Sequence, residues 1–252
     1  MGANRQVAYE IATKIEERLY DGITTAKILQ MLFRFLPKYR PATRHLIDLR
    51  KGLSLMRSKP EFEVFVQLLL AHHGFEVTPN QIIKGKCGEH EVDAVARKGG
   101  VTYYVEAKHH ENYHTPTGLD ESRIARAVLE DVTEGFSLGV NGLKVDRAMI
   151  VTNTRYSEHA TRYGSCRGIL QIGWSSPMGL DLRDMIEEKK LYPLTCLRGL
   201  RWEVQEKLGN AGVVLIKQLV EENPYALAMK TGLSRMALGE IVERAHAVMQ
   251  NL

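Results

Sequence analysis

This 252-residue sequence has few cysteines and no apolar run of membrane length. The three cysteines, Cys87, Cys166 and Cys196, are odd in number and widely separated, so they describe neither a disulfide framework nor a paired-cysteine zinc site. A signal-like amino terminus is lacking as well. These absences predict a cytoplasmic protein with no membrane partner.

A strong charge of either sign is also missing. The formal net charge is +4, which permits a nucleic-acid partner without requiring one. With 44% hydrophobic and 25% charged residues, the composition is that of an ordinary globular protein. The length is sufficient for one large domain or about two or three small ones.

Two β-rich runs joined by a Gly-Gly turn predict a β-hairpin. The runs cover residues 91–97 and 101–108, and a short glycine turn between such runs is typical of hairpins. Because side chains alternate faces along a strand, we expect Glu106 and Lys108 on the same face. We expect Asp93, on the preceding strand, to lie beside Glu106. Two carboxylates and an ammonium would then converge at one place.

These residue types suit metal-dependent hydrolysis of phosphodiesters. Carboxylate oxygens hold Mg²⁺, with Mn²⁺ as the alternative, so Asp93 and Glu106 are the predicted metal ligands. Lys108 is predicted to orient or deprotonate the attacking water. The plainer alternative is an exposed hairpin with an ordinary Glu and Lys pair, because an acid-x-lysine tripeptide is common.

A strand, helix and strand follow later in the chain. Residues 148–152 form a short apolar run, Ser157 can cap a helix, and residues 168–174 form a second strand-like run. This order predicts a right-handed crossover with parallel pairing, and therefore an α/β fold. Gln171 on the second strand is a candidate auxiliary polar group, and the alternative is a Gln on an edge strand or one satisfied within the core.

Several of these features together resemble a known family of nucleases. Asp93 and Glu106-Ala107-Lys108 resemble the lone acid and the acid-x-lysine element of the PD-(D/E)xK superfamily. The segments "FE…LL…GF.V", "IVTNT", "A..YG.CRGI", "IGW..P" and "LYPLT" recur in the order seen in Mrr-like restriction endonucleases, in particular the subgroup fused to ATP-cones. The similarity covers roughly residues 60–197. It implies a restriction-endonuclease-like mixed sheet flanked by helices and a DNA substrate.

Glu63 lies in the first turn of the helix that precedes the hairpin. In the Mrr-like family the Glu of this helix can reach the metal site, so the resemblance implies an auxiliary catalytic acid. The alternative is a carboxylate that complements the helix dipole, worth a few tenths to about 1 kcal/mol.

Both ends of the chain are predicted to be helical. The stretches "ATKIEERLYDGITT" and "RPATRHLIDLRKGL" resemble the helical part of an ATP-cone. That family begins with a basic hairpin that supplies much of its phosphate contact, and the sequence starts too late to contain it. Nucleotide binding is therefore doubtful, and a packing or dimerisation module is the favoured alternative.

The carboxy-terminal segment "LA…TGLS….…IV..A" resembles helix-hairpin-helix units. In those units the turn offers backbone N–H groups to a phosphate. A small interaction or capping domain is the alternative. The residues predicted to bind DNA in this region are Lys230, Thr231, Gly232, Ser234 and Arg235.

Histidines cluster after the hairpin. His109 and His110 are predicted to contact DNA phosphate from a loop at the mouth of the site. Together with His114, Cys87 and His90 they also raise the question of zinc, but they lack the paired spacing of a structural zinc site.

The combined prediction is a Mg²⁺-dependent endonuclease that hydrolyses DNA phosphodiester bonds in restriction or repair. Three domains are expected: residues 1–58, 59–196 and 197–252. Cutting two strands with one site per chain favours a homodimer. The alternative from another class is a non-hydrolytic DNA-binding or nucleotide-responsive regulator built on a nuclease scaffold.

Overall fold

The computed structural model describes residues 5–39, 41–177 and 179–250. The chain forms two compact units, Leu53–Pro193 and the pair of segments Met1–Gly52 and Leu194–Leu252. The predicted division into three domains stays a prediction. Among the described residues, no helix is both long and apolar enough to cross a membrane.

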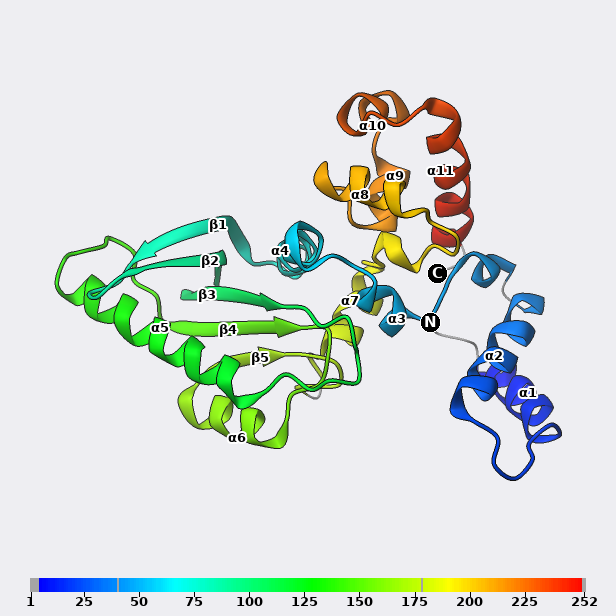
Figure 1. Ribbon diagram of the computed structural model, residues 1–252, viewed down its shortest axis with the longest axis horizontal. Coiled ribbons are helices and arrows are strands. Elements are labelled where there is room, and N and C mark those ends of the chain that lie inside the picture. The colour runs from blue at the N-terminus through cyan, green and yellow to red at the C-terminus, as the bar shows by residue number, and fades with distance from the viewer. Residues whose placement is uncertain (1–4, 40, 178, 251–252) are drawn as a thin grey trace. The chain divides into compact units, whose positions relative to one another are not determined.

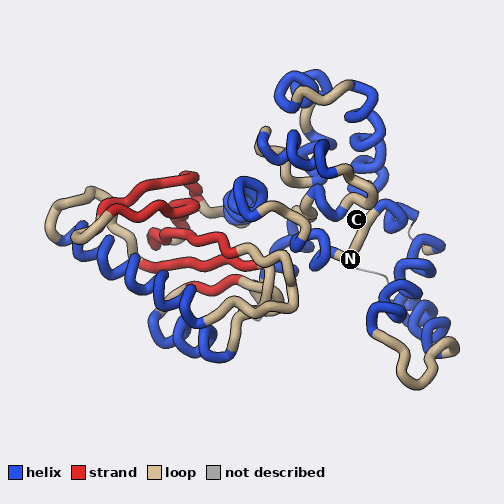
Figure 2. Tube along the Cα trace, in the orientation of Figure 1, coloured by secondary structure: helices blue, strands red, loops and turns tan. Residues whose placement is uncertain are grey.

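The unit Leu53–Pro193 is built on one mixed five-stranded sheet in the order β1-β2-β3-β4-β5 (Figures 1 and 2). The first three strands pair antiparallel, and β4 and β5 add in parallel. This confirms the predicted α/β fold, hairpin and parallel crossover. The strands are β1 (Glu76–Lys84), β2 (Glu89–Lys98), β3 (Val101–Lys108), β4 (Arg147–Thr152) and β5 (Leu170–Ile172).

Helices flank this sheet. A π-helical turn, Ser58–Phe62, leads into α4, and α5 and α6 lie together along one face of the sheet (Figure 1). The helix α4 contacts β1, β2 and α7. The bounds are α4 (Glu63–His72), α5 (Leu119–Ser137), α6 (Glu158–Arg167) and α7 (Leu182–Lys189).

Local sequence chemistry accounts for the central hairpin and for the start of α6. Gly99 and Gly100 both have positive φ, 58° and 76°, which glycine adopts without steric cost and which suits a tight hairpin turn. The side chain of Ser157 accepts a hydrogen bond from the backbone N–H of Ala160 and caps α6 as predicted. The helix then ends at Gly168, whose φ is 67°.

Two elements of this unit were not visible in the sequence. The strand β1 contains Pro79 and Asn80, and Asn80 has a φ of 47°, so its residues do not follow the simple alternation of a strand. Six of its nine residues are exposed, which removes the hydrophobic signal. The short helix α7 follows a turn-rich stretch and is capped by the side chain of Asp181.

The hydrophobic core between the sheet and α5 determines which face of β3 carries Glu106 and Lys108. Tyr104 is only 2% exposed and packs there with residues of α5, β4 and α6. Its hydroxyl donates to the backbone carbonyl of Ala125 at 2.5 Å. Because Tyr104, Glu106 and Lys108 share one face of the strand, the buried tyrosine fixes which way the two charged residues point.

Among the described residues of the second unit, the named elements are all helices, joined by turns and loops and by one isolated bridge between Leu46 and Leu197. In its first segment α1 packs against α2 and the turn that follows α2, around a small core of Ile11, Ile15 and Leu36. The side chain of Thr24 caps α2, and that of Ser234 caps α11. The helices are α1 (Arg5–Glu16), α2 (Thr25–Phe35), η1 (Leu36–Lys38), η2 (Pro41–His45), η4 (Leu194–Cys196), α8 (Trp202–Asn210), α9 (Ile216–Glu221), α10 (Pro224–Thr231) and α11 (Arg235–Met249). The helix α3 (Leu49–Ser54) spans the boundary between the units.

Gly164 of α6 tests how closely this helix packs on the sheet, and Gly239 of α11 serves as its control. A Cβ at Gly164 would lie 2.4 Å from the buried side chain of Gln171, whereas a Cβ at Gly239 in α11 meets nothing within 4 Å. We expect Gly164→Ala to lower the free energy of unfolding by about 1–3 kcal/mol through overpacking. Gly239→Ala is the matched control and should raise it by about 0.5–1 kcal/mol, because alanine favours the helix. Urea denaturation measures both. A stabilising Gly164→Ala would contradict this packing.

Candidate active site

The predicted site residues meet where β2 and β3 separate. The ladder between these strands runs from Lys98 paired with Val101 to Ala94 paired with Val105. At the next position the carboxylate of Asp93 accepts a hydrogen bond from the backbone N–H of Ala107 at 2.7 Å. Ala107 is the middle residue of the acid-x-lysine element. This contact therefore places Asp93 beside Glu106 and Lys108, as the hairpin predicted.

Gln67 of α4 holds the main chain of Asp93 in place. Its side-chain amide donates to the backbone carbonyl of Asp93 at 2.9 Å and to the side chain of Asn80 at 3.3 Å. These bonds hold the main chain of Asp93 while its carboxylate binds β3. No sequence pattern signals this role, because Gln67 lies in no motif and its contact with Asp93 depends on the packing of α4 against β2.

Glu106 carries the largest electrostatic perturbation in the site. Burial, followed by repulsion from Asp93, raises its pKa to about 7, against an opposing effect of Lys108. Within the described part of the chain, no cation forms an ion pair with this carboxylate. A carboxylate held near another and left without a paired cation is an environment that binds an added cation.

Glu63 lies at the start of α4 and joins the same group of charges. Burial raises its pKa, and the proximity of Asp93 adds to that increase, while a hydrogen bond with Lys59 opposes it. Lys59 Nζ lies 3.0 Å from Glu63 Oε1 and 3.5 Å from Glu91 Oε1. The pairing with Glu63 raises the pKa of Lys59. The structure thus brings Glu63 to Asp93, as the resemblance implied, and adds Lys59, which sequence reasoning missed.

Lys108 has a partner that the sequence did not predict. Its Nζ lies 3.0 Å from Oε1 of Glu121, in the first turn of α5. The two residues are brought together by the packing of α5 on the sheet. An acidic residue in the first turn of a helix is common for electrostatic reasons, so nothing in the sequence distinguished Glu121 from its neighbour Asp120.

The donor set fits a hard divalent cation better than zinc. Asp93, Glu106 and Glu63 offer carboxylate oxygens, which Mg²⁺ and Mn²⁺ prefer. Among the described residues, no three His, Cys, Asp or Glu side chains are gathered closely enough to form a ligand set by themselves. Mg²⁺ commonly takes one or two carboxylates and fills its other positions with water and phosphate oxygens.

The side chains of the two histidines that follow β3 have partners within the protein. His109 Nε2 lies 3.0 Å from the carbonyl oxygen of Leu53, and the ring packs at 5.2 Å against Phe62. His110 Nε2 lies 3.1 Å from the hydroxyl of Thr117. Burial lowers the pKa of both rings. Their predicted contact with DNA stays a prediction.

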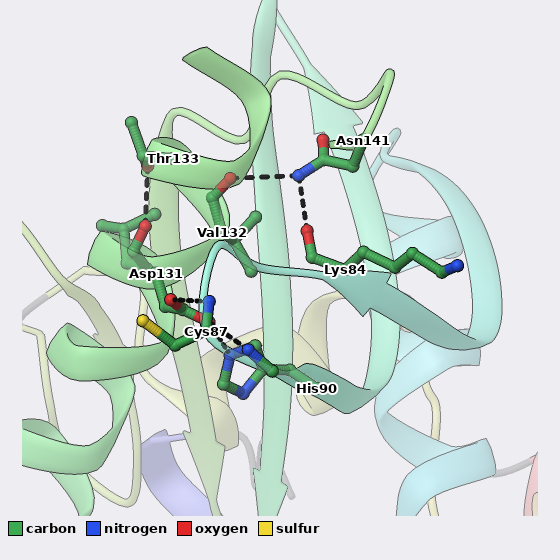
Figure 3. Close-up of polar contacts among 9 residues, drawn as sticks. Lys84, Cys87, His90, Asp131, Val132, Thr133 and Asn141 are labelled. Atoms are coloured by element: carbon green, nitrogen blue, oxygen red, sulfur yellow. Dashed lines mark hydrogen bonds and ion pairs between the residues drawn. The ribbon is translucent and has the colours of Figure 1, made fainter. Parts of the chain in front are cut away.

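Cys87 and His90 belong to a separate polar cluster on the β1–β2 turn (Figure 3). Asp131 of α5 accepts hydrogen bonds from the backbone N–H of Cys87 at 2.8 Å and of Gly88 at 3.3 Å, and it lies 2.8 Å from His90 Nε2. These contacts, His90 first, lower the pKa of Asp131 to about 2. The cluster ties the turn to α5 with an ionised carboxylate, which accounts for these residues without zinc.

Gln171 is satisfied within the core. Its side-chain amide donates to the hydroxyl of Ser122 and to the carbonyl of Ala160, both at 3.0 Å. Both partners lie in the layer formed by α5 and α6, so the alternative reading of this residue as a core Gln is confirmed.

The predicted DNA-binding turn lies between α10 and α11. Gly232 has a φ of 65° and caps α10, and the hydroxyl of Ser234 accepts the N–H of Ala237 at 3.2 Å. Thr231 donates to the carbonyl of Leu227 at 2.6 Å. These groups shape the turn. Lys230 lies 3.7 Å from Glu222, and the guanidinium of Arg235 stacks 4.0 Å from the Tyr225 ring.

Comparison with known proteins agrees with this fold. Residues 55–171 match a restriction endonuclease family, Mrr_cat, and residues 192–249 match a domain described as AF1548-like, C-terminal. An uncharacterized protein of Archaeoglobus fulgidus is 37% identical over 182 residues, which is 72% of this chain and 98% of that protein. A crystal structure of AF1548, described as a protein of unknown function, shares 33% identity with a TM-score of 0.66, over 81% of this chain and all of that one.

The fold and the family match define a restriction-endonuclease-like domain. The chain belongs to the same family as the Archaeoglobus fulgidus protein; within it, residues 55–171 match the restriction endonuclease domain family and residues 192–249 match the AF1548-like carboxy-terminal domain. The resemblances to an ATP-cone and to helix-hairpin-helix units stay predictions.

The raised pKa of Glu106 gives the site a testable pH dependence. Glu106 is protonated below about pH 7 and ionised above it. Because a cation binds the ionised form, Mn²⁺ or Mg²⁺ affinity should rise through this range and level off above it. We expect binding at about pH 6 to be about tenfold weaker than at pH 8, with proton release on binding. Calorimetry in buffers of different ionisation enthalpy measures both.

Glu106→Gln is the control for this titration. It keeps the side chain's size and removes the ionisable group, so metal binding should be weak and nearly independent of pH. An equally steep pH dependence in Glu106→Gln would assign the proton to another group.

Proposed function

We propose that this protein is a divalent-metal-dependent endonuclease that hydrolyses DNA phosphodiester bonds, with Mg²⁺ as the metal and Mn²⁺ as a substitute. The observation that carries the proposal is the hydrogen bond from Ala107 to the Asp93 carboxylate, which sets the lone acid against the acid-x-lysine element. The match of residues 55–171 to a restriction endonuclease family supports it.

Each charged residue of the site has a proposed role. Asp93 and Glu106 would hold the metal through carboxylate oxygens, and Glu63 would act as an auxiliary acid. When bound, a divalent cation supplies polarisation of the phosphoryl group and offsets charge on the leaving oxygen. Lys108 would orient the attacking water, because an ammonium held by Glu121 at 3.0 Å is positioned to donate hydrogen bonds.

DNA binding is proposed for the turn between α10 and α11 and for the histidines that follow β3. Lys230 and Arg235 flank the turn and suit backbone phosphates, which give affinity without reading sequence. A homodimer is proposed because two strands require two sites and a two-fold axis supplies them. Restriction and repair both fit this activity.

One test of this proposal concerns Lys108. Supercoiled plasmid should be nicked or linearised by the native protein with Mg²⁺ or Mn²⁺, and Lys108→Ala should cut at least about 100-fold more slowly. DNA binding, followed in parallel by fluorescence anisotropy, should stay within about threefold, because the change removes only a single charge. Lys84→Ala is the matched control, since Lys84 is exposed and pairs with Glu89 on a neighbouring strand.

Two results would count against the nuclease proposal. Cutting by Lys108→Ala at the native rate would remove Lys108 from the chemistry. If neither protein cuts in either metal and both bind DNA equally, the non-hydrolytic regulator becomes the better interpretation.

The second prediction concerns the turn between α10 and α11. The double variant Lys230→Ala/Arg235→Ala should weaken duplex binding uniformly across sequences and lower the slope of log affinity against log salt by about 2. Lys38→Ala/Lys207→Ala removes the same charge from the same unit and should leave the slope nearly unchanged. Equal slopes for the two double variants would exclude the turn as a DNA contact.

A further inference from the structure

A cavity in the helical unit is lined by cations and no carboxylates. It has a volume of about 600 Å³ and is bordered by Lys27, Gln30, Met31, Phe33, Arg34 and Arg198. The volume falls within the range of small-molecule sites, about 300–1,000 Å³. Three of its six lining residues carry positive charge, while the chain as a whole has a formal net charge of only +4.

The helix α2 brings two of these cations to one face. Lys27, Gln30 and Arg34 are three and four residues apart, so they follow one another along one side of the helix. The opposite side packs against α1 through Ile28 and Leu32. The polar face is therefore free of the α1–α2 core and open to a ligand.

Arg198 is held in place by backbone contacts. Its N–H donates to the carbonyl of His45 at 2.7 Å, and its guanidinium donates to the carbonyl of Leu46 at 3.2 Å. Arg244 in turn donates to the carbonyl of Arg198 at 2.8 Å. A guanidinium fixed in this way loses less conformational freedom when it binds an anion.

These three cations are not neutralised by the protein. Elsewhere lysines and arginines pair with acids, as in the pairs of Lys86 with Glu134 and Arg126 with Glu130. Across the described residues, by contrast, no carboxylate lies within ion-pair distance of Lys27, Arg34 or Arg198. Like charges gathered without counter-charge repel one another, and a multiply charged anion between them relieves that repulsion.

We propose that this cavity binds a phosphate-bearing ligand. Arginine binds phosphate oxygens in a bidentate manner and lysine adds a point charge, while Gln30 provides a neutral hydrogen-bonding group. Met31 and Phe33 give apolar surface for the uncharged part of the ligand. The phosphates come either from a small molecule such as a nucleoside triphosphate or from a nucleic-acid backbone. The site is separate from the acidic cluster around Asp93 and does not depend on cleavage.

The test measures binding to the full chain without divalent metal, so the chemistry of the nuclease site does not enter. Tripolyphosphate, ATP and a short blunt DNA duplex are titrated in turn by calorimetry at low salt. Lys27→Ala/Arg34→Ala removes two cations from the exposed face of α2 and leaves good helix formers. It should weaken binding of at least one probe by about tenfold or more. Arg162→Ala/Lys207→Ala removes one arginine and one lysine from exposed positions outside the cavity lining, and as the control with equal charge change it should alter binding by less than about twofold.

The probes separate the two sources of phosphate. Loss of tripolyphosphate and ATP binding in the cavity variant supports a small phosphorylated ligand. Loss confined to the duplex supports a backbone phosphate. Binding of all three probes that is absent, or that falls equally in the cavity and control variants, overturns the proposal whether or not the protein cuts DNA.

Discussion

The hydrogen bond between the Ala107 N–H and the Asp93 carboxylate is the contact on which the candidate active site depends. It forms where the ladder between β2 and β3 ends at Ala94 and Val105, so a side chain takes over from backbone pairing. This substitution brings the acid of one strand against the acid-x-lysine element of the next. The position of the site residues therefore depends on where the backbone pairing of β2 and β3 ends.

The carboxylates of Asp93 and Glu106 are held close together by the packing and hydrogen bonds around them. Tyr104 is buried two residues before Glu106 on the same face, and Gln67 holds the main chain of Asp93. Burial, followed by repulsion from Asp93, raises the pKa of Glu106 to about 7. The repulsion between the two carboxylates is unfavourable, and a bound cation would offset it. The proposed metal role of Asp93 and Glu106 therefore accounts for the arrangement.

Two lysines sit in contrasting positions around the acids. Lys59 pairs with Glu63 and lies near the outer carboxylate of Glu91, while Lys108 pairs with Glu121 of α5. Neither lysine forms its ion pair with Glu106, so that carboxylate keeps its oxygens available. The helical unit has the opposite charge distribution: Lys27, Arg34 and Arg198 border a cavity whose lining residues include no Asp or Glu.

The sequence by itself determined the central hairpin, the Ser157 helix cap, the parallel crossover and the candidate acids and lysine, because these depend on turn chemistry and strand alternation over a few residues. Only the tertiary structure decided β1, whose Pro79, Asn80 and exposed residues hide its pattern, and the partners Gln67 and Glu121. Those partners are 26 and 13 residues from Asp93 and Lys108 in the chain. They meet because α4 and α5 pack on the sheet, and no local spacing encodes such a long-range contact.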